Sequence, residues 1–247
     1  DLSFTSGGKT FKLESARPPA GAASTPPAGL EFDLVWVGGG TSADFAGREE
    51  LRLRLVHRAP KYGNDDVRAD SLMRRAFEAF FGAVDGRPCA RGGAYRIQML
   101  PTTCHGYFGS VTGALPDGRR AGLPLSEGIS PVQGADRHGP TAVVQSAAKM
   151  DHVRTGGTLL NMKFLPRSFK SEEGAKAFSS MLRGFVRLRI NHVQFNVVTR
   201  EDLIAAQKEP DKYRNLTIRV AGYTAYFTEL AEDLQNEIIA RTSYEDS

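Results

Sequence analysis

Two pairs of residues have types and spacing that could do chemistry. Cys104 and His105 could act as a nucleophile and its base, and Asp65 and Asp66 could bind a metal ion. Adjacent side chains on a helix or strand point in different directions, which argues against the first pair. We therefore interpret Cys104 as a buried thiol. No further ligands lie at a suitable spacing from the aspartates, so we favour turn or helix-capping roles for them.

Two glycine-rich segments resemble nucleotide-binding loops. The segment TSGGKT at 5–10 lacks the first glycine of a phosphate-binding loop, because Ser3 stands there, and we discard it. Gly38, Gly40 and Ala43 fit G-x-G-x-x-A, but the acid expected about twenty residues later is missing. A dinucleotide site therefore remains a minor alternative.

Residues 191–198, NHVQFNVV, alternate apolar and polar side chains as a strand does. His192, Gln194 and Asn196 share one face of this predicted strand. Such a face either meets water or lines a polar cavity. It carries neither lysine nor glutamate, so we favour a cavity lined by these three residues.

The nonapeptide RVAGYTAYF, residues 219–227, places Gly222 among residues typical of packed structure. Glycine adopts backbone conformations that are closed to other residues, so a turn or a helix C-cap is the simplest interpretation. That interpretation does not account for the specific neighbours, Arg219, Val220, Ala221 and Tyr223.

Helices and loops must position these groups. Helical periodicity and capping residues predict helices at 66–84, 171–187, 199–208 and 228–241, with Ser171 and Thr199 as N-caps. Residues 15–47, rich in Pro, Ala, Gly and Ser, are expected to be a linker. The segment 85–170 has many turn signals, and a loop region of this length is usually functional or well anchored.

Composition limits the function classes. The 247 residues carry 32 basic and 28 acidic side chains, scattered along the chain, which argues against nucleic-acid binding. No apolar run is long enough to cross a membrane. Two cysteines and no secretory signal favour a reduced, cytoplasmic compartment. A chain that begins at Asp1 suggests a processed or incomplete protein.

Longer stretches carry a family resemblance. RVAGYTAYF and the following DLQNEIIART resemble the signature of the glycyl radical enzymes, the pyruvate formate-lyase superfamily. APKYGNDD, PTTCHGYFGSVTGALPDGRRAG, GGTLLNMKF and HVQFNVV extend the resemblance over roughly residues 59–245. These segments are most similar to the dehydratase and decarboxylase branch of the superfamily, and within it to hydroxyproline dehydratase-like members.

The resemblance implies an α/β fold, the C-terminal portion of a glycyl radical enzyme barrel with a buried glycine loop. Gly222 would carry a backbone radical, with Arg219, Val220, Ala221 and Tyr223 as its loop. Glycine suits this role because the radical needs a planar α-carbon, which a side chain would crowd. The radical would generate a cysteine thiyl that cleaves a C–O, C–C or C–N bond of a small polar substrate, with dehydration favoured.

The resemblance also implies partners. It implies no bound cofactor and no metal, because an S-adenosylmethionine-dependent iron–sulfur activating enzyme installs the radical. Dimerisation, oxygen sensitivity and an anaerobic role are expected on the same basis. The Gly-Cys-x-Glu motif of the thiyl cysteine is absent, and neither Cys89 nor Cys104 lies in such a motif. We therefore expect an incomplete active site.

The resemblance divides the chain into four parts: 1–14, a remnant that follows the cysteine loop; 15–50, a low-complexity or divergent linker; 51–128, the end of the pyruvate formate-lyase-like barrel domain; and 129–247, the glycine radical domain. Two alternatives stay open. The chain could be a non-catalytic spare part that complements a damaged enzyme, or a truncated product without function.

Overall fold

The computed structural model describes residues 2–6, 9–13, 49–241 and 243–244. Within the first part, β1 (Leu2–Ser6) and β2 (Lys9–Leu13) pair as antiparallel strands. The proposed linker and the motif at Gly38, Gly40 and Ala43 lie outside the described residues, apart from the last two linker positions, which begin α1. Those expectations stay predictions.

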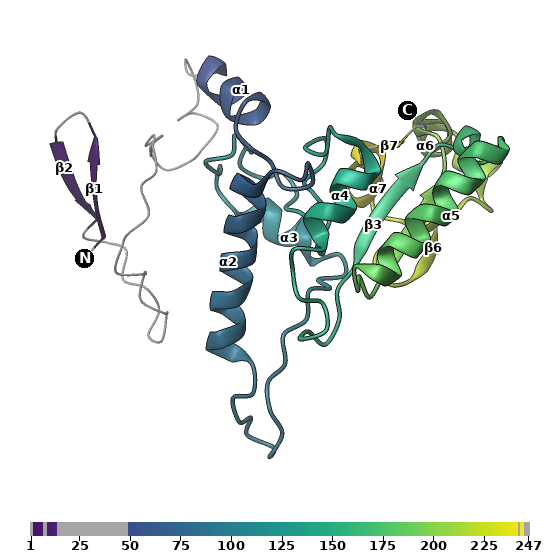
Figure 1. Ribbon diagram of the computed structural model, residues 1–247. Helices are drawn as coiled ribbons and strands as arrows, with labels where there is room; N and C mark the ends of the chain where they lie inside the picture. Colours follow the sequence, from purple (N-terminus) through teal and green to yellow (C-terminus); the bar gives the residue numbers. More distant parts are fainter. Residues whose placement is uncertain (1, 7–8, 14–48, 242, 245–247) are drawn as a thin grey trace.

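In the rest of the chain four helices come first, and short strands are interspersed among the helices that follow (Figure 1). The α-helices are α1 (Glu49–His57), α2 (Val67–Val84), α3 (Cys104–Val111), α4 (Gly139–Ala147), α5 (Glu172–Arg187), α6 (Arg200–Lys208) and α7 (Glu232–Ala240). The remaining strands are β3 (Leu160–Phe164), β4 (Val193–Val197), β5 (Thr217–Arg219), β6 (Thr224–Tyr226) and β7 (Ser243–Tyr244). Short 3-10 segments are η1 (Pro166–Phe169), η2 (Pro210–Tyr213) and η3 (Phe227–Glu229).

Three predicted helices are confirmed together with their caps. The Asp66 carboxylate accepts a hydrogen bond from the backbone N–H of Arg68 at the start of α2. Ser171 accepts from Gly174 before α5, and Thr199 accepts from Asp202 before α6. These bonds satisfy backbone donors that the first helical turn leaves without a partner.

The last helix is shorter than predicted. It was expected over 228–241, but α7 begins at Glu232 and ends at Ala240. Phe227 is fully buried, and its backbone N–H donates to the carbonyl of Leu216. From this anchor the chain forms the 3-10 turn η3, and Leu230 after it is extended. The helix therefore starts one turn later than its sequence pattern predicts.

A parallel sheet with the strand order β4-β3-β7 lies at the centre of the C-terminal half. Its register places Asn161 of β3 beside Gln194 of β4, and Lys163 beside Asn196. The sheet is open among the described residues. The predicted strand at 191–198 is confirmed, although β4 itself spans only Val193–Val197.

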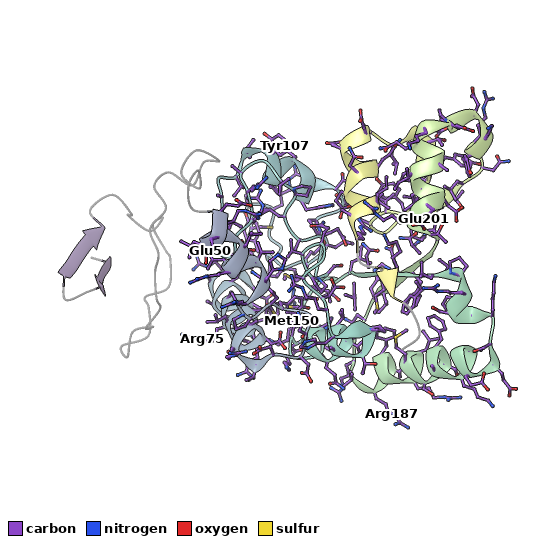
Figure 2. All side chains as sticks on the ribbon, turned by 90° about the horizontal axis from the view of Figure 1, so that it is seen from above. Glu50, Arg75, Tyr107, Met150, Arg187 and Glu201 are labelled. Carbon is purple, nitrogen blue, oxygen red and sulfur yellow. The ribbon has the colours of Figure 1, made fainter. Side chains whose placement is uncertain are left out.

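Hydrophobic clusters lie on the two sides of this sheet. On one face, Met162, Phe164 and residues of α2, α4 and α5 form a single cluster. On the other side, residues of α6, α7 and the β5–β6 hairpin form a second cluster. Figures 1 and 2 show α5 on one side of the sheet and α6, which carries Glu201, on the other.

The glycine- and proline-rich stretch at 85–170 is well anchored, and it contains α3 and α4. Arg119 is almost fully buried, and its guanidinium donates to the carbonyls of Gly109 at 2.7 Å and Gly113 at 2.8 Å, and to that of Leu123. One side chain thus holds several turns together by donating to their carbonyls. Of the helices described, none combines the length and apolar character that a membrane crossing needs.

Candidate functional site

Gly222 lies at the tip of a tight hairpin. Arg219 of β5 pairs with Thr224 of β6, and the Val220 N–H donates to the Tyr223 carbonyl at 2.9 Å. Ala221 and Gly222 are therefore the two central residues of the turn. Gly222 has φ +88°, a value that a type II turn requires at its third position and that favours glycine.

The space around Gly222 is open. A Cβ built on Gly222 would meet no described atom within 4 Å. The requirement for glycine is therefore conformational in this chain: an L side chain at φ +88° would be strained, although there is room for it.

The two arms of the hairpin differ in burial. Ile218, Val220 and Ala221 on the N-terminal arm are buried, at 2%, 0% and 1% exposure. Gly222 is exposed, and Tyr223 is 42% exposed. The buried glycine loop expected from the resemblance is thus realised for the N-terminal arm, whereas Gly222 itself is exposed, because no described residue covers the tip.

Two of the residues expected to line a cavity are buried. Gln194 and Asn196 are 3% and 6% exposed, whereas His192 precedes β4 and is half-buried. Asn196 does not face open space: its amide contacts the backbone of Arg219 in the hairpin. Both amide atoms of Gln194 are buried without a hydrogen-bond partner among the described residues. The polar face of β4 therefore points into the protein and not to solvent.

Asn161 and Lys163 on β3 belong to the same polar face and were missed by the sequence reasoning. Asn161 donates to the Val220 carbonyl at 3.1 Å and to the carboxylate of Glu127. The signal was present in LLNMKF, 159–164, where polar residues alternate with apolar ones. Only the pairing of β3 with β4 shows that the two polar faces are continuous.

Lys163 holds the end of α7. Its Nζ lies 3.4 Å and 3.3 Å from the carbonyls of Ile238 and Ile239, and the residue is 2% exposed. Burial, together with the positive charge of Arg241, lowers the pKa of Lys163 to about 8. The amine is thus a partner for two carbonyls at the helix terminus, of which that of Ile238 also accepts the backbone N–H of Arg241.

A buried charged cluster adjoins this face. Glu237 is 4% exposed, accepts from Arg241 at 2.9 Å and from Gln133 at 2.7 Å, and lies 3.7 Å from His105 Nε2. Burial alone would raise the pKa of Glu237, but His105 and Arg241 outweigh it and lower the pKa to about 2. Burial raises the pKa of Glu127, despite the nearby charge of Arg241. The two carboxylates therefore differ in their tendency to ionise.

A cavity of about 890 Å³ lies beside this cluster. Residues of α1, α3 and α7 line it, among them His105 and Glu237, together with Lys61 from the loop after α1 and residues between α3 and α4. Gly222 does not line it.

The structure corrects one of the first expectations and supports two others. Cys104 is exposed and not buried, because it begins α3 and points away from the interior, while its neighbour His105 is buried. Different directions for the two side chains were expected. Asp66 caps α2 as predicted.

Comparisons with known proteins agree on one family. Residues 125–228 match the family described as "Glycine radical", and residues 39–109 match "Pyruvate formate lyase-like". Trans-4-hydroxy-L-proline dehydratase of Clostridioides difficile is 47% identical over 86% of this chain and 27% of its own length. Probable dehydratase YbiW of Escherichia coli K12 is 42% identical over 81% of this chain and 26% of its own.

Solved structures show the same relation. The hydroxyproline dehydratase of Clostridioides difficile, with trans-4-hydroxy-L-proline bound, superimposes with a TM-score of 0.80 over 83% of this chain and 26% of its own, at 47% identity. The B12-independent glycerol dehydratase of Clostridium butyricum gives a TM-score of 0.78 over 82% of this chain and 26% of its own, at 43% identity. The chain thus spans about a quarter of the length of the relatives that it matches. With both family matches, the identities above 40% and the shared fold, the chain belongs to the glycyl radical enzymes of the pyruvate formate-lyase superfamily.

Proposed function

We propose that this chain carries the radical-bearing glycine of a lyase, and that Gly222 is that residue. The observation that carries the proposal is the hairpin tip at Gly222, with φ +88° and no described atom near its missing side chain. This position also lies inside the segment that matches the glycine radical family. Arg219, Val220, Ala221 and Tyr223 form the radical loop.

Activation removes one hydrogen atom from Cα of Gly222 and leaves one unpaired electron there. The neighbouring amide nitrogen and carbonyl share this electron when the α-carbon becomes planar. A radical S-adenosylmethionine activating enzyme is the partner that takes the hydrogen atom, and the exposed tip suits an encounter with it. The chain itself then supplies the loop geometry, a usual contribution of a protein to such chemistry.

The reaction class follows from the relatives. Two of them are dehydratases with identities of 47% and 42%, so we favour dehydration of a small polar substrate. Such chemistry needs a cysteine thiyl, and the 247 residues contain no Gly-Cys-x-Glu motif. His192, Gln194 and Asn196 remain proposed as the polar lining near the site. We also propose that the protein is sensitive to oxygen, lies in the cytoplasm and forms a homodimer. The segments 51–128 and 129–247 are proposed as barrel and glycine radical domains.

Anaerobic activation followed by electron paramagnetic resonance tests the role of Gly222. We expect a doublet that collapses to a narrower line when glycine α-hydrogens are replaced by deuterium, because the α-hydrogen causes the splitting. Gly222→Ala should give no such signal, and Gly86→Ala is a control for loss of another exposed glycine with positive φ and open space around it. An unchanged doublet in Gly222→Ala would refute the assignment.

A second function uses the same hairpin. We propose as the alternative a spare part, which supplies the Gly222 hairpin to a damaged enzyme. Mixing the activated chain with a full-length relative that lacks its own radical glycine distinguishes the two candidate functions. Restored turnover in the mixture, with none from either protein alone, supports the spare part. Multiple turnover by the chain alone supports a self-sufficient lyase.

A further inference from the structure

The N-terminal arm of the glycine hairpin is held by side chains from the neighbouring sheet. We infer that Asn196 and Asn161 are positioning residues that clamp the backbone directly before Gly222 and so hold the radical loop in place. This inference rests on the proposed role of Gly222. It assigns to the two asparagines the role of holding the loop.

Asn196 uses both ends of its amide on one residue of the loop. The Arg219 N–H donates to Asn196 Oδ1 at 2.7 Å, and Asn196 Nδ2 donates to the Arg219 carbonyl at 2.8 Å. A neighbouring β-strand would make the same two bonds to a residue of β5. The side chain therefore replaces a strand at the outer edge of the hairpin and ties it to β4.

Asn161 holds the next carbonyl. Its Nδ2 lies 3.1 Å from the carbonyl oxygen of Val220, and the same nitrogen donates to Glu127. The Ser130 hydroxyl accepts from the backbone N–H of Asn161 and donates to Glu127. Both the backbone of Asn161 and the carboxylate that its side chain contacts are therefore fixed by Ser130. Arg219 and Val220 are consecutive, and their carbonyls are fixed by adjacent strands of one sheet.

This arrangement restrains one arm and leaves the other exposed. Val220 is fully buried beneath its clamp, whereas Tyr223 and Tyr226 on the other arm are 42% and 44% exposed. Buried hydrogen bonds to backbone groups are costly to break without a replacement. The clamp therefore sets how often the N-terminal arm leaves the sheet, and with it how long Gly222 stays in one place.

Gln194 provides a matched control. It lies on the same strand and the same face as Asn196, is equally buried, and makes no hydrogen bond in the described residues. Replacing either amide by leucine removes a buried polar group of comparable size. Only Asn196→Leu removes contacts to the hairpin, so a difference between the two variants reports on the clamp.

Single-residue hydrogen exchange of the full chain, without activation, tests the clamp directly. In Asn196→Leu the Arg219 amide loses its acceptor, so its exchange should accelerate by roughly tenfold or more. In Gln194→Leu it should stay near the wild-type rate. Equal rates at Arg219 in the two variants would overturn the inference, whatever Gly222 does.

Activation adds a second measurement. After anaerobic activation, the Gly222 doublet should decay several-fold faster in Asn196→Leu than in Gln194→Leu, because the loop leaves the sheet more often. Equal decay would overturn the positioning role. Absence of a doublet in the wild-type chain would instead refute the proposed function, and the exchange result would still decide whether the clamp exists.

Asn161→Ala covers the case in which Asn196→Leu does not fold, as circular dichroism would show. It removes one bond to the Val220 carbonyl and keeps the Arg219 amide paired with Asn196. We expect faster exchange at the Val220 N–H, which closes the turn on Tyr223, and little change at Arg219. No change at either amide would contradict the inference.

Discussion

The two faces of the parallel sheet β4-β3-β7 differ in chemistry. One face carries Phe164 and Phe195, whose rings pack with that of Phe178 of α5 at centroid distances of 5.9 Å and 5.0 Å, respectively. The opposite face carries four buried polar residues. They are Asn161, Lys163, Gln194 and Asn196.

The difference shows how one sheet can serve two purposes. The aromatic face buries area and tolerates small shifts, because its contacts are numerous and non-directional. Three of the polar side chains bind backbone groups of the hairpin and of α7 through directional bonds. The aromatic face therefore supplies stability, while the polar face determines where Gly222 and α7 lie.

Removing a ring from the aromatic face should have the largest effect on stability. Phe164 is 6% exposed and contacts several rings, so Phe164→Ala should lower the free energy of unfolding by about 3–5 kcal/mol. Urea denaturation followed by circular dichroism measures this. Val186→Ala, at 79% exposure on α5, should change it by less than about 0.5 kcal/mol. A loss below about 1 kcal/mol for Phe164→Ala would argue that the face is not a core.

A smaller effect, dependent on pH, is expected from Lys163. Its pKa is about 8 when folded and near 10.5 when unfolded, so the unfolded chain binds more protons between these values. Stability should therefore rise between pH 8 and 10.5, by up to about 3 kcal/mol relative to Lys163→Met. Lys170→Met, which removes an exposed lysine, should keep the slope of the wild type. An equal slope in Lys163→Met would show that the amine is not buried.

The smallest stability change is expected at Gln194. Its amide has no partner in the described residues, so Gln194→Leu removes a buried polar group that contributes no hydrogen bond there. The free energy of unfolding should stay within about 1 kcal/mol of the wild type or increase slightly. Denaturation under the conditions used for Phe164→Ala measures it. A loss of more than about 2 kcal/mol would mean that Gln194 has a partner in solution.

Local elements were largely predictable. The caps Asp66, Ser171 and Thr199 and the helices after them follow from residue type and spacing alone, because capping bonds join residues two or three positions apart. The start of α7 was not predictable from the sequence, because it depends on Phe227 being buried against a distant part of the chain. The exposure of Cys104 was missed for the same reason.

The family and the glycine at its centre were accessible from the sequence, because RVAGYTAYF is a contiguous string and glycine is required by its own backbone conformation. The polar face was visible only as alternation in two separate strands. That Asn161 and Asn196 meet the same hairpin depends on β3 pairing with β4 in one register and on the hairpin packing against that face. Tertiary structure alone decided this, because hydrogen bonds between residues 23 and 59 positions apart form only once the chain has folded.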